Sequence, residues 1–370
     1  MQFADIIGQG AVIRKLRDSV QAGRIPHAQL FVGMEGSGAL PIALAYAQYV
    51  GCKNRSETDS CGVCPSCVKH QKFSHPDVRF SYPVIKKGTE EALATDFIRE
   101  WMAALGENPY LSYLDWLAKM DAGNKQGNIP VSECRAIMSA LSLKPFERDY
   151  KILLLWLPEY LGNEGNILLK IIEEPPQKTL FLLVAEQMDQ ILPTILSRTQ
   201  LVRVPPIEGE DLRRALEQRF SLEAARAETL AYVSDGSFRR ALELLGEVDQ
   251  PLLQPFRQWL LMCFSGNKAA QNLWVAEAAG SGREEIKALL GYGLHILRMC
   301  LVYPELGEKA RLGEAEQEFV SKLSRQFNPT TIERAYKLFN DSMYQIERNG
   351  QAKLVLADLS NEMHKVFVQK

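Results

Sequence analysis

The sequence predicts an α/β fold built on a mostly parallel sheet, followed by an all-helical region. Up to about residue 205, short apolar runs alternate with amphipathic segments, as in strands joined by crossover helices. Pro205 and Pro206 end this alternation, and the rest of the chain has helical patterning only. With 370 residues, 46% of them hydrophobic and 24% charged, the chain is long enough for two or three domains with separate cores.

Five apolar runs are the predicted strands: 30–32, 78–82, 152–157, 180–184 and 201–204. Amphipathic helices are predicted between them, for example at 132–143 and 163–174. The segment 85–128 interrupts the alternation with two further predicted helices that carry Trp101, Tyr110, Tyr113 and Trp116. Such aromatic residues can stack on bases, but they more often form the core of an insertion, and we predict a core.

The charge balance restricts the possible partners. A net charge of -2 excludes nucleic-acid binding by bulk electrostatics, because phosphate neutralisation needs clustered Lys and Arg. Contact with DNA is therefore expected to be local or shared with partners. The N-terminal stretch lacks the layout of a signal peptide, and no apolar run approaches the 18 residues of a membrane span. We expect a cytoplasmic protein without membrane contacts.

The stretch HAQLFVGMEGSGALP at 27–41 has the outline of a nucleotide-binding loop. Its glycines, Gly33, Gly36 and Gly38, follow an apolar run and precede a predicted helix. In a P-loop, the next two residues are a Lys that reaches the phosphates and a Ser or Thr that holds Mg²⁺. Here they are Ala39 and Leu40, so the loop is predicted to be degenerate.

Four of the seven cysteines lie close together in the pattern C-x8-C-G-V-C-P-S-C; they are Cys52, Cys61, Cys64 and Cys67. Four thiolates in tight turns suit a tetrahedral Zn²⁺ site, and a closed four-sulfur shell makes the metal structural. The alternative is two disulfides, which a reducing cytosol disfavours. His70 and His75 lie close enough in the sequence to compete as ligands.

Further motifs follow in order along the chain: FADIIGQ at 3–9, RIPHA at 24–28, SLKPF at 142–146, NILLKIIEEPP at 166–176, LPTILSR at 192–198, GSFRRAL at 236–242 and NGQAKLVL at 349–356. Together with the glycine loop and the cysteines, they resemble the bacterial clamp-loader subunits of the AAA+ class, among them the delta-prime subunits of DNA polymerase III. The resemblance implies an AAA+ core at 1–205 with a zinc module at 52–67, a helical lid at 206–248 and a helical collar at 249–370. The insertion at 85–128 departs from the usual family length.

The same resemblance implies that the chemistry of ATP hydrolysis has been lost. The family strand that ends in two magnesium-coordinating and water-activating carboxylates corresponds to KILLLWLPE at 151–159, which places Trp156 and Leu157 at the acidic positions and Glu159 beyond them. Glu186 replaces the usual sensor threonine and is expected to repel a γ-phosphate. We therefore expect neither ATP as a cofactor nor intrinsic ATPase activity.

Two arginines are candidates for contact with phosphate. In the family, the Arg of a Ser-Arg-Cys motif reaches the neighbouring subunit's nucleotide as an arginine finger, and Arg198 holds that position in Ser197-Arg198-Thr199. On sequence alone, pairing of Arg198 with a local carboxylate is the simpler interpretation, whereas the resemblance favours the role in trans. Arg239 lies on the predicted second-sensor helix, where a structural salt bridge is expected because the subunit's own site is degenerate.

The resulting hypothesis is a non-hydrolysing subunit of the DNA polymerase III clamp loader. Its implied partners are gamma/tau-like and delta-like subunits in a hetero-pentamer, with the sliding clamp and primed DNA contacted through the assembly. Two alternatives remain: an active gamma/tau-like ATPase subunit, and a zinc-bearing adaptor without a catalytic role.

Overall fold

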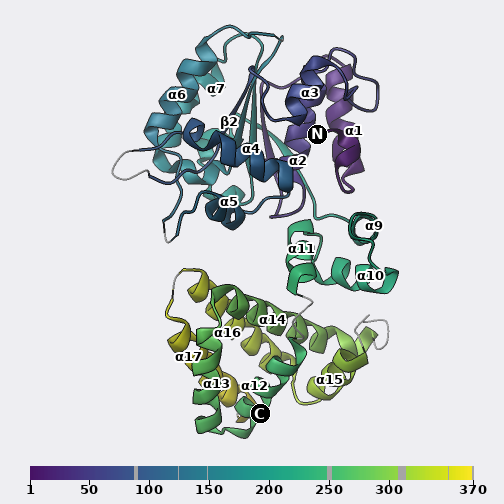
Figure 1. Ribbon diagram of the computed structural model, residues 1–370, viewed down its shortest axis with the longest axis vertical. Helices are drawn as coiled ribbons and strands as arrows, with labels where there is room; N and C mark the ends of the chain where they lie inside the picture. The colour runs from purple at the N-terminus through teal and green to yellow at the C-terminus, as the bar shows by residue number, and fades with distance from the viewer. Residues whose placement is uncertain are drawn as a thin grey trace. The chain divides into compact units, whose positions relative to one another are not determined.

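The computed structural model describes residues 1–86, 91–123, 125–147, 149–247, 252–306, 314–348 and 350–368. The chain divides into two compact units, Met1–Glu243 and Leu244–Lys370 (Figure 1). Parts of several sequence predictions lie outside the described residues, namely 87–90 and 124 in the insertion, 148 in the core, 248 in the lid, 249–251, 307–313 and 369–370 in the collar, and 349 in the last motif. The boundary between a core at 1–205 and a lid at 206–248 stays a prediction.

A five-stranded sheet in the order β2-β3-β4-β1-β5 organises the first unit. Its strands are β1 (Ala28–Val32), β2 (Val78–Ser81), β3 (Lys151–Trp156), β4 (Thr179–Ala185) and β5 (Gln200–Arg203). All four pairings are parallel, and Leu30 is in register with Leu183 on one side and Leu201 on the other. The predicted parallel sheet is confirmed, and each predicted strand lies within two residues of its observed bounds. Every residue of β3 and β4 is buried, which explains their continuous apolar runs.

Helices cover both faces of this sheet (Figure 1). One face packs against α1 (Gly10–Gln21), α2 (Ala39–Gly51), α4 (Ile98–Glu107) and α5 (Tyr113–Lys119). The other packs against α6 (Val131–Ser142), the 3-10 helix η3 (Pro158–Leu168), α7 (Leu169–Glu173) and α8 (Pro193–Leu196). The alternation of side chains along β3 serves both layers, since Leu154 joins the first core and Leu153 the second. Shorter elements complete the layers: η1 (Phe3–Asp5), α3 (Pro65–Gln71), η2 (Ala94–Phe97) and η4 (Met188–Gln190).

One predicted helix is divided. The segment 163–174 was expected to be a single amphipathic helix, but it consists of the second part of η3 followed by the short α7. The backbone leaves helical geometry at Gly162, and Gly165 follows within the same turn. Two glycines so close together weaken an α-helix, which is consistent with the tighter 3-10 winding.

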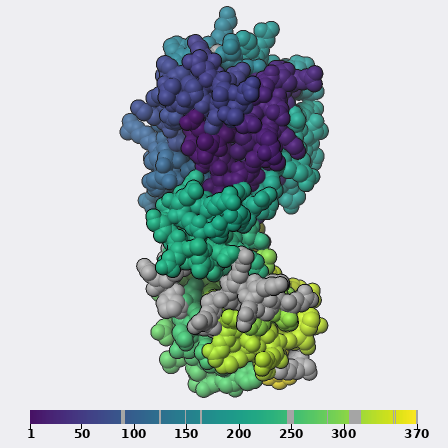
Figure 2. Space-filling view, turned by 90° about the vertical axis from the view of Figure 1, so that its right-hand side faces the viewer, coloured from purple at the N-terminus to yellow at the C-terminus, as the bar shows by residue number. Residues whose placement is uncertain are grey.

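Three helices follow Pro205 and Pro206: α9 (Gly209–Phe220), α10 (Ala224–Val233) and α11 (Phe238–Glu247). We call them the lid helices. Figure 2 shows a face of the first unit formed by residues near the N-terminus, in purple and dark blue, with the lid helices in green next to them. Leu212, Leu216 and Ala227 are fully buried, so α9 and α10 have a shared apolar core.

The predicted insertion is an integral part of the first core. Trp101 from α4 and Trp116 from α5 are both 0% exposed. Trp101 stacks on Tyr82 with ring centroids 4.2 Å apart, and it contacts Trp116 and Trp156 at 5.2 Å each. The prediction that these aromatic residues form a core rather than a base-stacking platform is therefore confirmed.

The second unit is entirely helical in its described residues. Its helices are α12 (Leu253–Ser265), α13 (Lys268–Gly280), α14 (Arg283–Leu306), α15 (Glu314–Ser324), α16 (Pro329–Glu347) and α17 (Ala352–Val368). In the part of the chain that is described, one stretch, Glu285–Pro304, has the length and composition to cross a membrane, with a mean hydropathy of 1.3. Sequence inspection missed it because Lys287 and Arg298 interrupt the apolar run. Of this stretch, 44% is buried in the fold, where Ile296 and Cys300 pack in the helical core.

Candidate functional site

The glycine loop connects β1 to α2, as predicted for a P-loop-like turn. Gly38 has φ +99° and precedes the first turn of α2, a conformation that glycine adopts without strain. Gly36, with φ +76°, lies directly against the start of α11: its carbonyl accepts a hydrogen bond of 3.0 Å from the N–H of Phe238. A Cβ at Gly36 would lie 2.8 Å from the backbone nitrogen of Arg239, so only glycine allows this approach.

The cavity above the glycine loop is very small. It has a volume of about 20 Å³ and is lined by residues that include Ala39, Leu40, Tyr110, Trp156 and Glu186. This volume accommodates about one water molecule, whereas pockets for small ligands usually measure about 300–1,000 Å³. In this conformation the loop is closed.

The residues predicted to replace the catalytic carboxylates belong to the core. Trp156 and Leu157 are each 2% exposed. Trp156 lines the small cavity and contacts Trp101 of the insertion, while the N–H of Leu157 donates to the carbonyl of Val184 at 2.8 Å. Neither side chain has an oxygen that could coordinate Mg²⁺ or activate water.

Tyr110, from the connection between α4 and α5, covers the glycine loop. Its hydroxyl accepts a hydrogen bond of 2.9 Å from the N–H of Ile7. Its ring lies 3.2 Å from the position that a Cβ on Gly38 would take. On the lid side, the ring meets Phe238 edge to face, with centroids 4.9 Å apart. Tyr110 therefore bridges the N-terminal segment, the glycine loop and α11.

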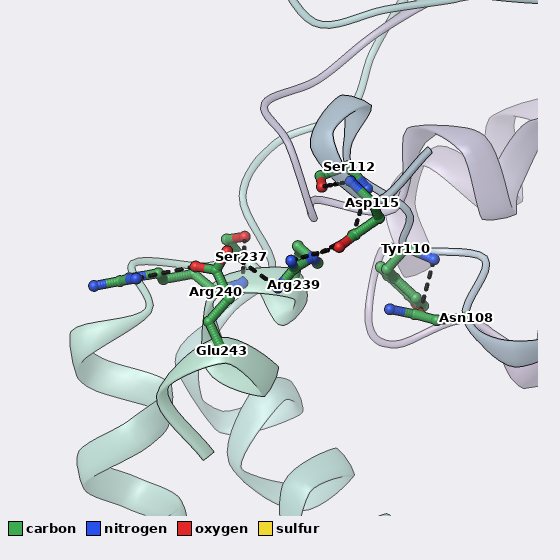
Figure 3. Close-up of polar contacts among 8 residues, drawn as sticks. All are labelled: Asn108, Tyr110, Ser112, Asp115, Ser237, Arg239, Arg240 and Glu243. Carbon is green, nitrogen blue, oxygen red and sulfur yellow. Dashed lines mark hydrogen bonds and ion pairs between the residues drawn. The ribbon is translucent and has the colours of Figure 1, made fainter. Parts of the chain in front are cut away.

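Arg239 forms the salt bridge that its sequence context predicts, and its partner is Asp115 at the start of α5 (Figure 3). Nη2 of Arg239 donates to Oδ1 of Asp115 at 2.6 Å, and Nε of Arg239 donates to Oδ2. Arg239 also forms a second ion pair, with Glu243, at 3.1 Å. Burial alone would raise the pKa of Asp115, but hydrogen bonds from Arg239 and Ser112 outweigh this effect and lower it. Asp115 is therefore an anion at neutral pH.

Sequence reasoning missed the roles of Tyr110 and Asp115. The spacing of Ser112 and Asp115 is that of a capping box, which the structure contains and which could have predicted the start of α5. Nothing local could have revealed the pairing of Asp115 with Arg239, because 124 positions separate the two residues.

The charge at Glu186 differs from the expectation. Burial, together with the neighbouring Glu35 and Glu159, raises the pKa of Glu186 to about 8. Glu159 accepts hydrogen bonds from the N–H groups of Glu186 and Gln187 at 2.6 and 2.8 Å and so fixes the turn after β4. With this raised pKa, Glu186 carries less negative charge near neutral pH than the expected repulsion of a γ-phosphate assumes, and the repulsion itself stays a prediction.

Replacing Glu186 by Gln is expected to stabilise the protein increasingly as the pH rises above 4.5, with the largest effect at alkaline pH. Since the pKa rises from 4.5 in the unfolded chain to about 8 in the folded one, the stability that the protonated carboxyl contributes is complete below pH 4.5 and is lost as the pH rises through 8. In thermal unfolding, Glu186→Gln should exceed the wild-type midpoint at about pH 9 and match it at about pH 4. The exposed Glu174→Gln is the control, and an equal shift at both pH values would contradict the assignment.

Arg198 lies in the turn between α8 and β5. Its Nε donates to Oε2 of Glu173 at 3.0 Å, and Nη1 donates to the carbonyl of Thr194 at 3.0 Å and to Oγ of Ser197 at 3.3 Å. The Arg198 side chain is 32% exposed and that of Glu173 is 58% exposed. In the isolated chain, Arg198 thus has the local carboxylate partner that the simpler interpretation expects.

The four clustered cysteines converge on one point. Their sulfur atoms, those of Cys52, Cys61, Cys64 and Cys67, all lie within 4.8 Å of one another, and all are free thiols rather than disulfides. A tetrahedral Zn²⁺ with bonds of about 2.3 Å would place its sulfur ligands about 3.8 Å apart, and the Cys61 and Cys67 sulfurs are 3.9 Å apart. The donor set therefore fits a metal ion. His70 and His75 lie outside this group, and their rings meet at a tilt of 34° with centroids 4.6 Å apart.

Comparisons with known proteins agree with the motif order. Residues 8–208 match the family described as "DNA polymerase III, delta subunit". The chain is 27% identical over 248 residues to DNA polymerase III subunit tau of Escherichia coli, covering 65% of this chain and 32% of that protein. It is 26% identical over 249 residues to subunit gamma of Buchnera aphidicola, covering 66% of this chain and 57% of that protein.

The chain thus spans about a third of the tau relative and somewhat more than half of the gamma relative. Among solved structures, a gamma-subunit-related protein of DNA polymerase III from Thermotoga maritima aligns with 95% of this chain and 98% of its own, at 16% identity and a TM-score of 0.40. The family match covers more than half of the sequence. The chain therefore belongs to the DNA polymerase III delta subunit family.

Proposed function

We propose that this chain is a non-hydrolysing, delta-prime-like subunit of a DNA polymerase III clamp loader. The closed glycine loop carries the proposal, because a cavity of about 20 Å³ lined by Ala39 and Leu40 has neither room nor charge for a nucleotide. Each missing hydrogen bond between a charged group and phosphate forfeits about 1.5–3 kcal/mol. An active gamma/tau-like ATPase would need those groups together with the carboxylates that Trp156 and Leu157 replace.

The proposal includes the assembly. The chain would combine an AAA+ core at 1–205, a lid at 206–248 and a collar at 249–370, and would occupy one place in a cytoplasmic hetero-pentamer with gamma/tau-like and delta-like subunits. The tau and gamma names of its relatives support this setting. The chain would contact the sliding clamp and primed DNA through the assembly, and it would not contact a membrane.

Within this ring, Arg198 would act in trans on a neighbour's ATP. A planar, permanently charged guanidinium suits bidentate contact with phosphate. Its present partner Glu173 is largely exposed, and exposed ion pairs contribute only about 0–1 kcal/mol. Exchange of Glu173 for a phosphate group therefore costs little.

Cys52, Cys61, Cys64 and Cys67 would hold a structural Zn²⁺. Zinc supplies four strong bonds that tie the loop after α2 to the start of α3. A zinc-bearing adaptor without a role in catalysis is the remaining alternative, and the behaviour of Arg198 separates it from the present proposal.

Arg198→Ala in a reconstituted loader is expected to lower clamp- and DNA-stimulated ATPase and the rate of clamp loading, with normal assembly by gel filtration. An arginine finger stabilises charge that develops in the transition state and contributes about 10³–10⁵ in kcat at a single site. Other sites in the ring would dilute this to a partial loss of total turnover.

Arg198→Lys should rescue poorly, since an ammonium lacks the planar fork, whereas Glu173→Gln should retain activity because it leaves the guanidinium in place. The isolated chain should hydrolyse no ATP above a mock preparation, so that the lost turnover belongs to a neighbour. Wild-type loading by Arg198→Ala would refute the role in trans and leave a scaffold.

A further inference from the structure

The insertion reaches the nucleotide position through residues 108–115, which we call the insertion tip. Its two main contacts are made by Tyr110 and by Asp115, which pairs with Arg239 (Figure 3). Tyr110 is 2% exposed and lies over Gly38, between Ile7 and Phe238. Its ring therefore takes up space that a ligand of the glycine loop would need.

Asp115 places a negative charge beside the lid. Its two oxygens accept hydrogen bonds from Nε and Nη2 of Arg239, and the Arg239 side chain is only 16% exposed. This is the paired geometry in which arginine also binds phosphate oxygens. Asp115 thus satisfies a lid arginine close to the glycine loop without any bound anion.

The insertion tip is held rigidly on the core. Trp116, one residue beyond it, is 0% exposed, and its Nε1 donates to the carbonyl of Pro83 at 2.7 Å. At the other end, Oδ1 of Asn108 accepts from the N–H of Tyr110 at 3.0 Å. Between them, Ser112 and Asp115 exchange capping hydrogen bonds of 3.0 Å. A tip that is fixed in advance loses little entropy when it contacts the lid.

We propose that the insertion tip is a built-in substitute for nucleotide that holds the lid helices against the core. Tyr110 fills the space over the glycine loop, and Asp115 provides the anion for Arg239. Lid position in this chain is consequently independent of ATP. This property belongs to the isolated chain, so it stands or falls separately from the action of Arg198 on a neighbour.

Hydrogen–deuterium exchange of the full chain tests the proposal. Arg239→Gln and Tyr110→Ala should each accelerate amide exchange in α9–α11 by about ten-fold, the scale of losing one hydrogen bond to a charged group, while β3 and β4 stay protected. The double variant Asp115→Arg with Arg239→Asp should restore part of the protection, because it rebuilds the ion pair with its polarity reversed. Added ATP with Mg²⁺ should leave lid exchange of the wild type unchanged.

Two matched variants separate this effect from damage to the insertion itself. Leu114→Ala shortens an exposed side chain of the insertion tip without touching Asp115 or Arg239, and Glu107→Ala removes a surface ion pair with Lys119; both should leave lid exchange at the wild-type rate. Unchanged exchange in Arg239→Gln and Tyr110→Ala would overturn the proposal. So would an equal acceleration by Leu114→Ala, or a wild-type lid that ATP with Mg²⁺ protects.

Discussion

Cys64→Ser is expected to abolish stoichiometric zinc binding and to lower the thermal midpoint by the largest amount of any single change considered. Wild-type chain should contain one Zn²⁺ by elemental analysis. Structural zinc contributes about 10–16 kcal/mol in small finger peptides, which sets the upper scale. The cysteine loop also supports its surroundings, because Asp59 accepts hydrogen bonds from the N–H groups of Phe3 and Ala4 at 3.1 and 2.9 Å. Loss of the metal should therefore loosen the N-terminal segment as well.

Cys134→Ser is the matched control, because Cys134 is fully buried but lies outside the cluster. It is expected to cost packing energy but to keep one zinc per chain. Wild-type protein that is purified under reducing conditions, folded and free of zinc would contradict the assignment of Cys64 and its three neighbours as ligands.

Trp101→Ala should destabilise the first unit by about 3–5 kcal/mol, the usual cost of removing a large buried aromatic side chain. Trp101 contacts Tyr82, Trp116 and Trp156 at once, so its removal leaves a cavity that a rigid sheet cannot close. Denaturant unfolding followed by circular dichroism measures the change in the free energy of unfolding.

Leu114→Ala provides the comparison within the same insertion, because Leu114 is 52% exposed. Its effect should stay within about 0.5 kcal/mol of the wild type. If Trp101→Ala costs no more than Leu114→Ala, the aromatic cluster contributes nothing to the core and the insertion is a peripheral addition.

The sheet could be predicted from the sequence because its buried parallel strands are uninterrupted apolar runs. Strands β3 and β4 are buried on both faces, so no polar residues interrupt their apolar pattern in the sequence. The cysteine cluster could also be predicted from the sequence, because its four thiols lie within sixteen residues and local turns determine their relative positions. The turn between β1 and α2 could be predicted because its glycines follow an apolar run and precede a helical pattern.

The rest depends on distant contacts. The pairing of Asp115 with Arg239 joins two segments 124 positions apart, and no periodicity encodes it. The protonation of Glu186 follows from burial and from Glu35 and Glu159, which only the folded chain brings together. The division of the helix predicted at 163–174 follows from a backbone change at Gly162 that propensity alone did not locate.

The contact between Trp156 and Trp101 bears on the evolutionary reversibility of this site. An acidic residue in place of Trp156 would supply the carboxylate that the proposed function takes to be missing, but would put a charge into the aromatic cluster. Ala39→Lys would return a phosphate ligand to a loop that Tyr110 still covers. Each of these single substitutions is thus expected to destabilise the chain or to leave it without nucleotide binding. Under the proposed function, no single substitution at position 39 or 156 is therefore expected to give the chain ATPase activity.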